Sequence, residues 1–142
     1  MTDLANQFPR SPRDTSIAGY VIAARAVDKC RAVLNETAGE YHTGCPLDKF
    51  WFDFTGIKFK DFRSFVATGA DDEAVSAWVT EQTPKIKRRQ IIAWNNQMRD
   101  LRISKLPIKL QEFLEEYIPQ YLPENKKAYV WFDVYDIEEQ RI

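Results

Sequence analysis

Glycine and proline residues divide the first half of this chain into segments of helical length. Gly39, Gly56 and Gly69 each follow a run in which apolar residues recur at three- and four-residue steps, and Pro46 opens one such run. Glycine favours the left-handed conformation that ends helices, whereas proline suits the first helical turn. The spacing therefore predicts helices over residues 20–38, 46–55 and 57–68.

Similar signals predict three further helices. Asp71-Asp72-Glu73 places acids at the positive end of a helix dipole, so we expect a helix to begin there. Thr83 as cap and Pro84 in the first turn predict a second helix. A third is expected over residues 107–118, between Pro107 and the breakers Pro119 and Pro123.

The two ends of the chain are less regular. Residues 1–19 contain Pro9 and Pro12, which favour an extended arm, and we expect Phe8 to pack that arm against the body. The C-terminal segment, residues 124–142, fits both helical and strand spacing. We favour a short helix there, because the sequence offers no second strand to pair with.

The composition supports a buried core and excludes several classes of protein. Hydrophobic residues make up 44% of the 142 residues and aromatic residues 13%. We therefore predict one compact all-α domain spanning residues 1–142, with about five or six helices and the extended N-terminal arm. The net charge of −1 gives no reason to expect nucleic acid as a partner.

The sequence shows no pattern typical of a secretory signal or a membrane span. The first residues lack the basic start and apolar run of a secretory signal, and no apolar run approaches membrane-spanning length. Two cysteines are too few for a disulfide scaffold in a chain of this length. We expect a soluble, cytoplasmic, bacterial protein that does not bind a membrane.

The segment from Gly39 to Asp48 is the candidate site. It combines His42, the single histidine, with Cys45, one of two cysteines, and is broken by Gly and Pro residues. Loops of this kind often carry function. His42 and Cys45 could act as base and nucleophile, so they are the candidate catalytic residues.

Two other interpretations of this loop stay open. Half of a zinc site is possible, but such a site needs four ligands, and the remaining cysteine, Cys30, belongs to an apolar helical stripe. We therefore expect no metal and no cofactor. The interpretation that we favour is a structured loop in which Tyr41 and His42 bond to backbone groups and Cys45 packs inward.

Two groups of cations could meet either an anion or acidic side chains of the chain itself. Arg10 and Arg13 could grip a carboxylate or phosphate, but we favour a role in fastening the arm by pairing with Glu40 or Asp48. The run Lys85–Arg89 lies near an expected helix start, where the dipole opposes cations. Acids from neighbouring segments are the explanation that we favour, and a bound anion is the alternative.

Several motifs resemble the uncharacterised bacterial family catalogued as domain of unknown function 5069. The motifs are Pro9-Arg10-Ser11-Pro12-Arg13, Asp28-Lys29-Cys30-Arg31, Gly39-Glu40-Tyr41-His42, Cys45-Pro46-Leu47-Asp48, Trp94-Asn95 and Trp131-Phe132-Asp133. The resemblance implies no particular activity. The chain departs from the family pattern in the basic run 85–89, where family members tend to carry acids, and at Gln140-Arg141, where a Gly-Arg pair is common.

Three functional hypotheses follow. The first is a binding module for a protein partner or a small anionic ligand. Its candidate binding residues are Arg10, Arg13, Glu40, Tyr41, Asp48, Trp94 and Asn95. The second is an enzyme of unknown class with His42 as general acid or base, assisted by Cys45, Glu40 or Asp48. The third is a structural or assembly role, and the sequence indicates no oligomeric state.

Overall fold

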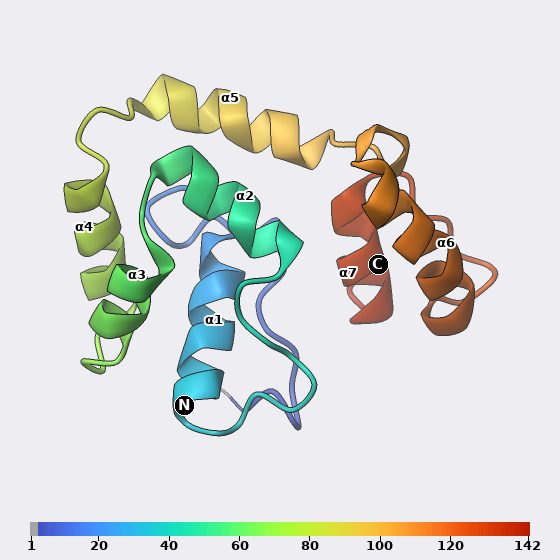
Figure 1. Cartoon of the computed structure of the whole chain (residues 1–142), viewed down its shortest axis with the longest axis horizontal. Helices are drawn as coiled ribbons and strands as arrows, with labels where there is room; N and C mark the ends of the chain where they lie inside the picture. Colours follow the sequence, from blue (N-terminus) through green and yellow to red (C-terminus); the bar gives the residue numbers. More distant parts are fainter. Residues whose placement is uncertain (1–2) are drawn as a thin grey trace. The chain divides into compact units, whose positions relative to one another are not determined.

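The computed structural model describes residues 3–142 and is all-helical over that range, as the sequence predicted. Within residues 3–142 the chain forms seven α-helices, which Figure 1 labels, and one short 3₁₀ helix, η1. Their bounds are α1 Ala23–Leu34, α2 Pro46–Thr55, α3 Phe59–Val66, α4 Asp72–Gln82, α5 Arg88–Arg99, η1 Ile103–Lys105, α6 Ile108–Tyr121 and α7 Trp131–Glu138. The predicted count of five or six was too low, because the C-terminal segment forms a seventh α-helix.

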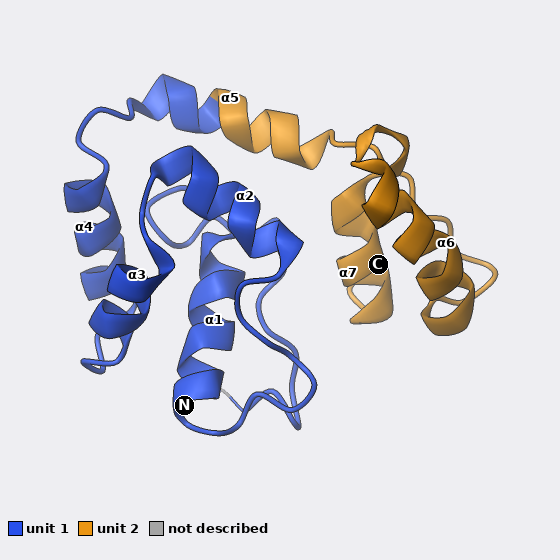
Figure 2. Cartoon of the chain, viewed as in Figure 1, with its two compact units in different colours: residues 1–92 blue, residues 93–142 orange. Residues whose placement is uncertain are grey.

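The chain divides into two compact units, residues 1–92 and residues 93–142 (Figure 2). The division falls within α5, between Ile92 and Ala93. The expectation of one domain spanning the whole chain stays a prediction.

Helix α1 is the centre of the first unit. It packs against α2 and α3, and every residue from Tyr20 to Cys30 is buried. Three charged residues of this helix, Arg25, Asp28 and Lys29, are buried with the apolar ones. A helix enclosed on several sides must bury polar groups, and these require partners.

The ends of α1 lie inside the predicted range of 20–38. Ile22 has a φ of 74° and Glu36 a φ of 58°, and both values are outside the helical region. The helix therefore begins at Ala23 and ends at Leu34. By contrast, the bounds of α2 agree with the prediction, and Gly56 ends it in the left-handed conformation.

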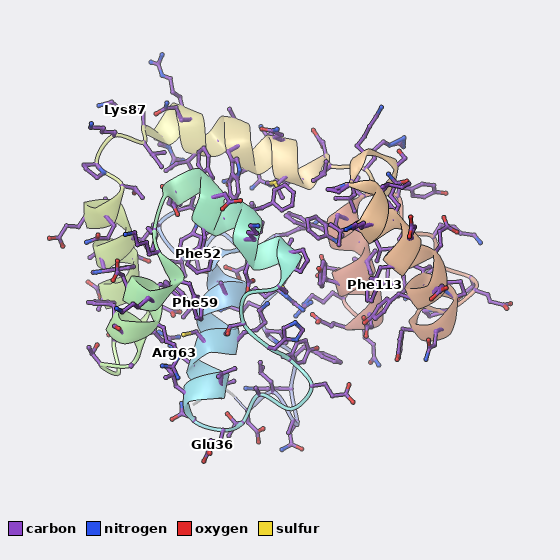
Figure 3. The ribbon with its side chains drawn as sticks, viewed as in Figure 1. Glu36, Phe52, Phe59, Arg63, Lys87 and Phe113 are labelled. Carbon is purple, nitrogen blue, oxygen red and sulfur yellow. The ribbon has the colours of Figure 1, made fainter. Side chains whose placement is uncertain are left out.

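Aromatic rings fill the space between α1, α2 and α3. Trp51 and Phe62 are fully buried, with ring centroids 5.5 Å apart in an edge-to-face arrangement. Phe52 contacts both Phe62, at 5.3 Å, and Phe59, at 5.7 Å (Figure 3). Such pairs contribute about 0.5–1.5 kcal/mol each beyond their buried area. Buried Trp51 and Phe62, with half-buried Phe52 and Phe59 around them, thus form the aromatic part of the core.

The N-terminal segment is irregular rather than uniformly extended, and it contains turns between residues 4 and 22. Four of its residues are buried against the rest of the protein: Leu4, Pro9, Pro12 and Ile17. Phe8 is 48% exposed, so the prediction that it packs the arm was wrong. Adjacent side chains of an extended segment point to opposite sides, and it is Pro9 that points inward.

The connection between α4 and α5 also differs from the prediction. Thr83 does not cap the following helix, because its hydroxyl donates to the Val79 carbonyl at 2.8 Å and accepts from Tyr20 Oη at 3.3 Å. It therefore closes α4, and α5 begins only at Arg88. The Gln90 side chain accepts from the Lys87 N–H at 2.7 Å, which satisfies one amide at the start of α5.

In the second unit, α6 and α7 form a helical pair joined by the hydroxyl of Tyr117, which donates to the Glu138 carboxylate. Helix α6 runs through Pro119 to Tyr121, so the prediction that Pro119 ends it was wrong. The carbonyl that loses its partner belongs to exposed Glu115, where water can replace the bond.

The C-terminal segment contains a single β-bridge followed by a helix. Val130 forms an isolated antiparallel bridge with Arg102, and α7 begins at the next residue. Asp133 accepts from the backbone N–H groups of Tyr129 and Val130 at 3.0 and 3.1 Å, which fixes the start of α7. The predicted short helix is therefore confirmed.

Candidate functional site

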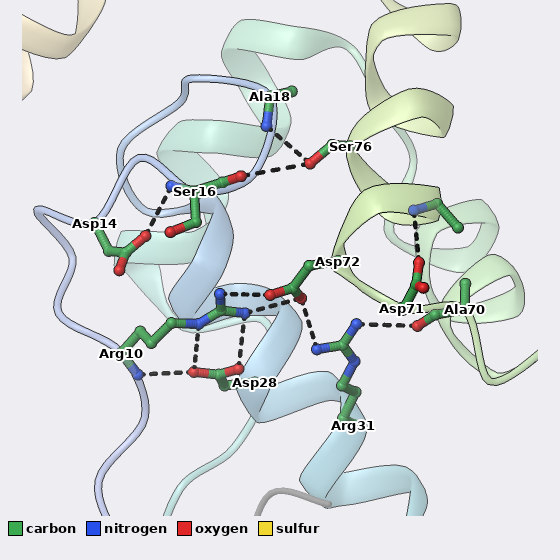
Figure 4. Close-up of polar contacts among 11 residues, drawn as sticks. Arg10, Asp14, Ser16, Ala18, Asp28, Arg31, Ala70, Asp71, Asp72 and Ser76 are labelled. Atoms are coloured by element: carbon green, nitrogen blue, oxygen red, sulfur yellow. Dashed lines mark hydrogen bonds and ion pairs between the residues drawn. The ribbon is translucent and has the colours of Figure 1, made fainter.

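Arg10 fastens the N-terminal arm to α1 and α4 through two carboxylates (Figure 4). Its Nε and Nη2 donate to Asp28 at 3.1 and 3.0 Å, and its Nη1 and Nη2 donate to Asp72 at 2.8 and 3.2 Å. The backbone N–H of Arg10 also donates to Asp28, at 2.8 Å. Fastening was the predicted role, but the expected partners Glu40 and Asp48 were wrong.

Arg31 completes this ionic cluster. Its Nη1 donates to Asp72 at 2.8 Å and its Nη2 to the Ala70 carbonyl at 3.0 Å. Burial alone would lower the pKa of Arg10, but hydrogen bonds and charge from Asp28 and Asp72 raise it above its ordinary value. Burial would likewise raise the pKa of Asp72, whereas the two guanidinium groups hold it below its ordinary value.

The cluster leaves little capacity for an external anion. Two guanidinium groups face two carboxylates, so the charges balance, and the Arg10 donors are used within the chain. Asp72 lies in the acidic run that the sequence assigned to a helix start, and the neighbouring Asp71 does cap α4 by accepting from the Ala74 N–H at 2.8 Å.

The loop before α2 is held close to the N-terminal segment. The Leu4 N–H donates to the Thr37 carbonyl at 2.7 Å. Gly39 has a φ of 59°, and a Cβ there would lie 2.9 Å from the Leu4 carbonyl oxygen. Gly44, with a φ of 75°, has open space around its Cα. Only the first of these glycines is required by a close backbone approach.

A buried ionic group lies where this loop enters α2. Lys29 Nζ lies 2.9 Å from Asp48 Oδ2, and the two side chains are 4% and 2% exposed. Lys29 Nζ also lies 3.2 Å from the Sγ of Cys45, the N-cap residue of α2. Asp48 Oδ1 is buried without a hydrogen-bond partner in residues 3–142. The structure thus brings together two predicted site residues, Cys45 and Asp48.

Lys29 was missed by sequence reasoning, although it lies within one of the motifs that resemble the family. The sequence signal for its burial was its position on an apolar helix, directly before Cys30. A lysine buried among apolar residues needs a counter-charge, but the sequence analysis assigned Asp48 to Arg10, Arg13 or His42 instead.

The exposed part of the loop is short. Tyr41 is half-buried, and the guanidinium carbon of Arg25 lies 5.6 Å from its ring centroid. Glu40 and His42 are exposed. Within residues 3–142, no hydrogen bond joins His42 to Cys45 or to a backbone carbonyl, so the expected backbone bond of His42 is wrong.

The other predicted binding residues lie apart from this group in the sequence and differ in burial. Arg13 is half-buried, and its N–H donates to Ser11 Oγ at 3.1 Å. Trp94 and Asn95 lie in α5, within the second unit, and both are buried. That burial fits a packing role, and their part in a binding site stays a prediction.

The basic run does not have the acidic partners that we expected. Lys85, Lys87, Arg88 and Arg89 are all exposed, and none of them forms an ion pair within residues 3–142. Figure 3 shows Lys87 beside the start of α5. Together with Gln90 the four cations line a shallow surface hollow.

The described residues contain neither a metal-binding cluster nor a membrane-spanning helix. Across residues 3–142, no three Cys, His, Asp or Glu side chains are grouped so that they could hold a metal ion. None of the helices in that range is both long and apolar enough to span a bilayer. The cytoplasmic location stays a prediction.

Comparison with known proteins places the chain in a family. A family model described as "Domain of unknown function (DUF5069)" matches residues 6–141. The chain belongs to this family. The match to DUF5069 covers the arm, the loop and both compact units, and so confirms the resemblance carried by the motifs. No curated protein matches the chain.

Proposed function

We propose that this protein is a binding module that presents the loop of residues 39–45 to a protein partner. The observation that carries the proposal is the contrast within this loop. Its C-terminal end is fastened by the buried group of Lys29, Cys45 and Asp48, and Tyr41 lies against Arg25. Glu40 and His42, on either side of Tyr41, are exposed.

A fastened loop with exposed polar side chains suits recognition. Binding costs less when a loop is already ordered, because fewer side-chain and backbone conformations are lost. His42 can donate and accept hydrogen bonds, and Glu40 can accept them or pair with a cation. These two side chains supply polar specificity for a protein surface.

A protein partner is favoured over a small anion. The hypothesis that the arm binds an anion relied on Arg10 and Arg13. The charge of Arg10 is balanced by Asp28 and Asp72, and Arg13 is half-buried. Arg25, whose guanidinium lies against Tyr41, is 2% exposed and donates to the Arg10 carbonyl at 3.2 Å. The guanidinium groups of Arg10 and Arg25 are thus engaged within the chain.

The enzyme hypothesis has weaker support. A catalytic histidine is usually oriented by a second group, and within residues 3–142 His42 has no such hydrogen bond. A thermal-shift screen of anions and metals tests it, because ligand binding to the folded state raises the melting temperature. A shift in the wild type that is lost in His42→Ala would favour that alternative over ours.

The proposal is tested by photo-crosslinking in the cells that produce the protein. A photoreactive amino acid replaces His42 in one variant and exposed Lys60, on α3, in a control variant. We expect one protein to be captured from position 42 and not from position 60. That protein is then purified, and its affinity is measured for the wild type and for Glu40→Ala and His42→Ala.

We expect at least one of the two substitutions to weaken binding about tenfold, which corresponds to about 1.4 kcal/mol. The same capture pattern at both positions would contradict the proposal. So would affinities of both variants within about twofold of the wild type, since the loop would then contribute almost nothing to the interface.

A further inference from the structure

The buried group at the start of α2 contains a nucleophile, an amine and a carboxylate in contact. Cys45 Sγ accepts a hydrogen bond from Lys29 Nζ at 3.2 Å, and that nitrogen lies 2.9 Å from Asp48 Oδ2. We propose that Cys45 and Lys29 form a peroxide-sensitive pair, in which oxidation joins Sγ to Nζ by a covalent sulfur–nitrogen bond. This inference does not depend on the proposed function.

The geometry favours reaction between these two atoms. A separation of about 3–3.5 Å, with the atoms held by the fold, is typical of reacting groups before bond formation. Lys29 is 3% exposed and has little freedom to move away. Cys45 is half-buried, so a molecule as small as hydrogen peroxide can reach its sulfur.

The first step oxidises sulfur. The thiolate of Cys45 attacks one oxygen of hydrogen peroxide, the O–O bond breaks, and hydroxide leaves with the thiol proton as water. Sulfur loses two electrons, peroxide is reduced, and Cys45 becomes a sulfenic acid.

The second step is a condensation. Lys29 transfers one ammonium proton to Asp48, and the neutral nitrogen attacks the sulfenic sulfur. The S–O bond breaks, and hydroxide leaves with a second proton from nitrogen as water. One ammonium group, one thiol and one peroxide thus give one N–S bond and two waters. Of the three ammonium protons, the first ends on Asp48, the second leaves in water and the third stays on the nitrogen.

Asp48 is suited to receive that proton. Its Oδ1 is buried and has no hydrogen-bond partner in residues 3–142, so an acceptor site is available. Once Lys29 loses its charge, an ionised Asp48 would be an unpaired buried charge, which is costly. Proton transfer removes both charges together.

The neighbouring sequence removes a competing reaction. Sulfenic acids also condense with backbone nitrogen atoms. The residue after Cys45 is Pro46, whose nitrogen carries no hydrogen, so the adjacent peptide group cannot form such a ring. Within residues 3–142, the nitrogen that hydrogen-bonds to the sulfur is that of the Lys29 amine.

The test uses the full chain carrying Cys30→Ala, which excludes a disulfide with the second cysteine. The protein is treated with hydrogen peroxide, digested with trypsin without reductant, and analysed by mass spectrometry. We expect the intact mass to fall by about 2 Da, because two hydrogens are lost. We also expect peptide 26–31 to be joined to peptide 32–49, and a dithiol to reverse both changes.

Two variants in the same background identify the atoms. Cys45→Ser should show no mass loss. The double variant Lys29→Met, Asp48→Leu replaces the ion pair with apolar side chains so that the protein can still fold. It should accumulate sulfenic or sulfinic acid, which add about 16 and 32 Da.

Peptide mapping of the protein that retains Lys29 is sufficient even if the double variant does not fold. Oxygen addition at Cys45 with no joined peptides would overturn the proposal. It would also be overturned if the double variant lost about 2 Da like its parent, because another nitrogen would then be the partner.

Discussion

The ionic anchor of the arm gives the most specific prediction about stability, tested by Arg10→Ala. Asp28 is 9% exposed and loses both side-chain hydrogen bonds with Arg10 in this variant. Breaking a buried ion pair typically costs about 3–5 kcal/mol. Arg10 itself is 26% exposed, so we expect the loss of the Asp28 contact to cost about 3 kcal/mol, at the lower end of that range.

The second partner contributes less. Asp72 is 45% exposed and keeps its bond with Arg31, so losing the Arg10 contact costs at most about 1 kcal/mol. The predicted total for Arg10→Ala is therefore about 3–4 kcal/mol, a large part of the stability of a typical domain. Arg10→Lys keeps a charge but not the planar fork, and should cost about half as much.

The measurement is urea unfolding followed by helical circular dichroism. Arg63→Ala is the matched control, because Arg63 is exposed on α3 and has no ion pair within residues 3–142, and it should change stability by less than about 0.5 kcal/mol. A double-mutant cycle between Arg10 and Asp28 should show a coupling of about 2 kcal/mol or more. A cost below about 1 kcal/mol for Arg10→Ala would refute the reasoning, since the arm would then be held by apolar contacts alone.

Three further predictions concern pH, thiol reactivity and backbone strain. The pKa of Asp72 is lower in the folded than in the unfolded protein. Ionised Asp72 therefore contributes to the free energy of unfolding above about pH 4, and this contribution is lost as the pH falls through the lowered value. Unfolding titrations between about pH 5 and 2 should show a weaker pH dependence for Asp72→Asn, and equal dependence would contradict this. Half-buried Cys45 should react with a thiol reagent in the folded protein. Cys30 should react only after unfolding, because burial raises its pKa to about 11. Equal labelling rates of the two cysteines would be inconsistent with the burial of Cys30 in the core. Gly39→Ala should destabilise the protein by about 2–3 kcal/mol and Gly44→Ala by about 1 kcal/mol. Both glycines have positive φ, but only a side chain at Gly39 would meet another backbone segment. Chemical denaturation measures both effects, and the reverse order would show that the close approach at Gly39 is absent.

The helices of the first unit could be predicted because their signals are local. Pro46 at the first turn of α2 and Gly56 at its end act within a few residues of their own position. The burial of Cys30 followed from its place in an apolar stripe. Prediction failed where a local signal was used differently, as at Thr83, whose hydroxyl bonds back to α4 instead of capping α5.

The contacts within the candidate site could not be predicted from the sequence. The sequence identified the loop, Cys45 and Asp48, but it did not identify Lys29 as the residue that joins them. It also assigned His42 a backbone bond, whereas the imidazole is exposed. Side-chain exposure within a loop depends on what packs beside it, and local pattern carries no information about that.

The sequence by itself determined the helical class, most helix positions and membership of the DUF5069 family. Only the tertiary structure decided which charges meet. Arg10 pairs with residues 18 and 62 positions away, and the chain contains 20 basic and 21 acidic side chains that could pair in many ways. Helix signals act through hydrogen bonds between residues about four apart, whereas an ion pair requires only proximity in space, which the packing of α1, α2 and α4 around the arm alone provides.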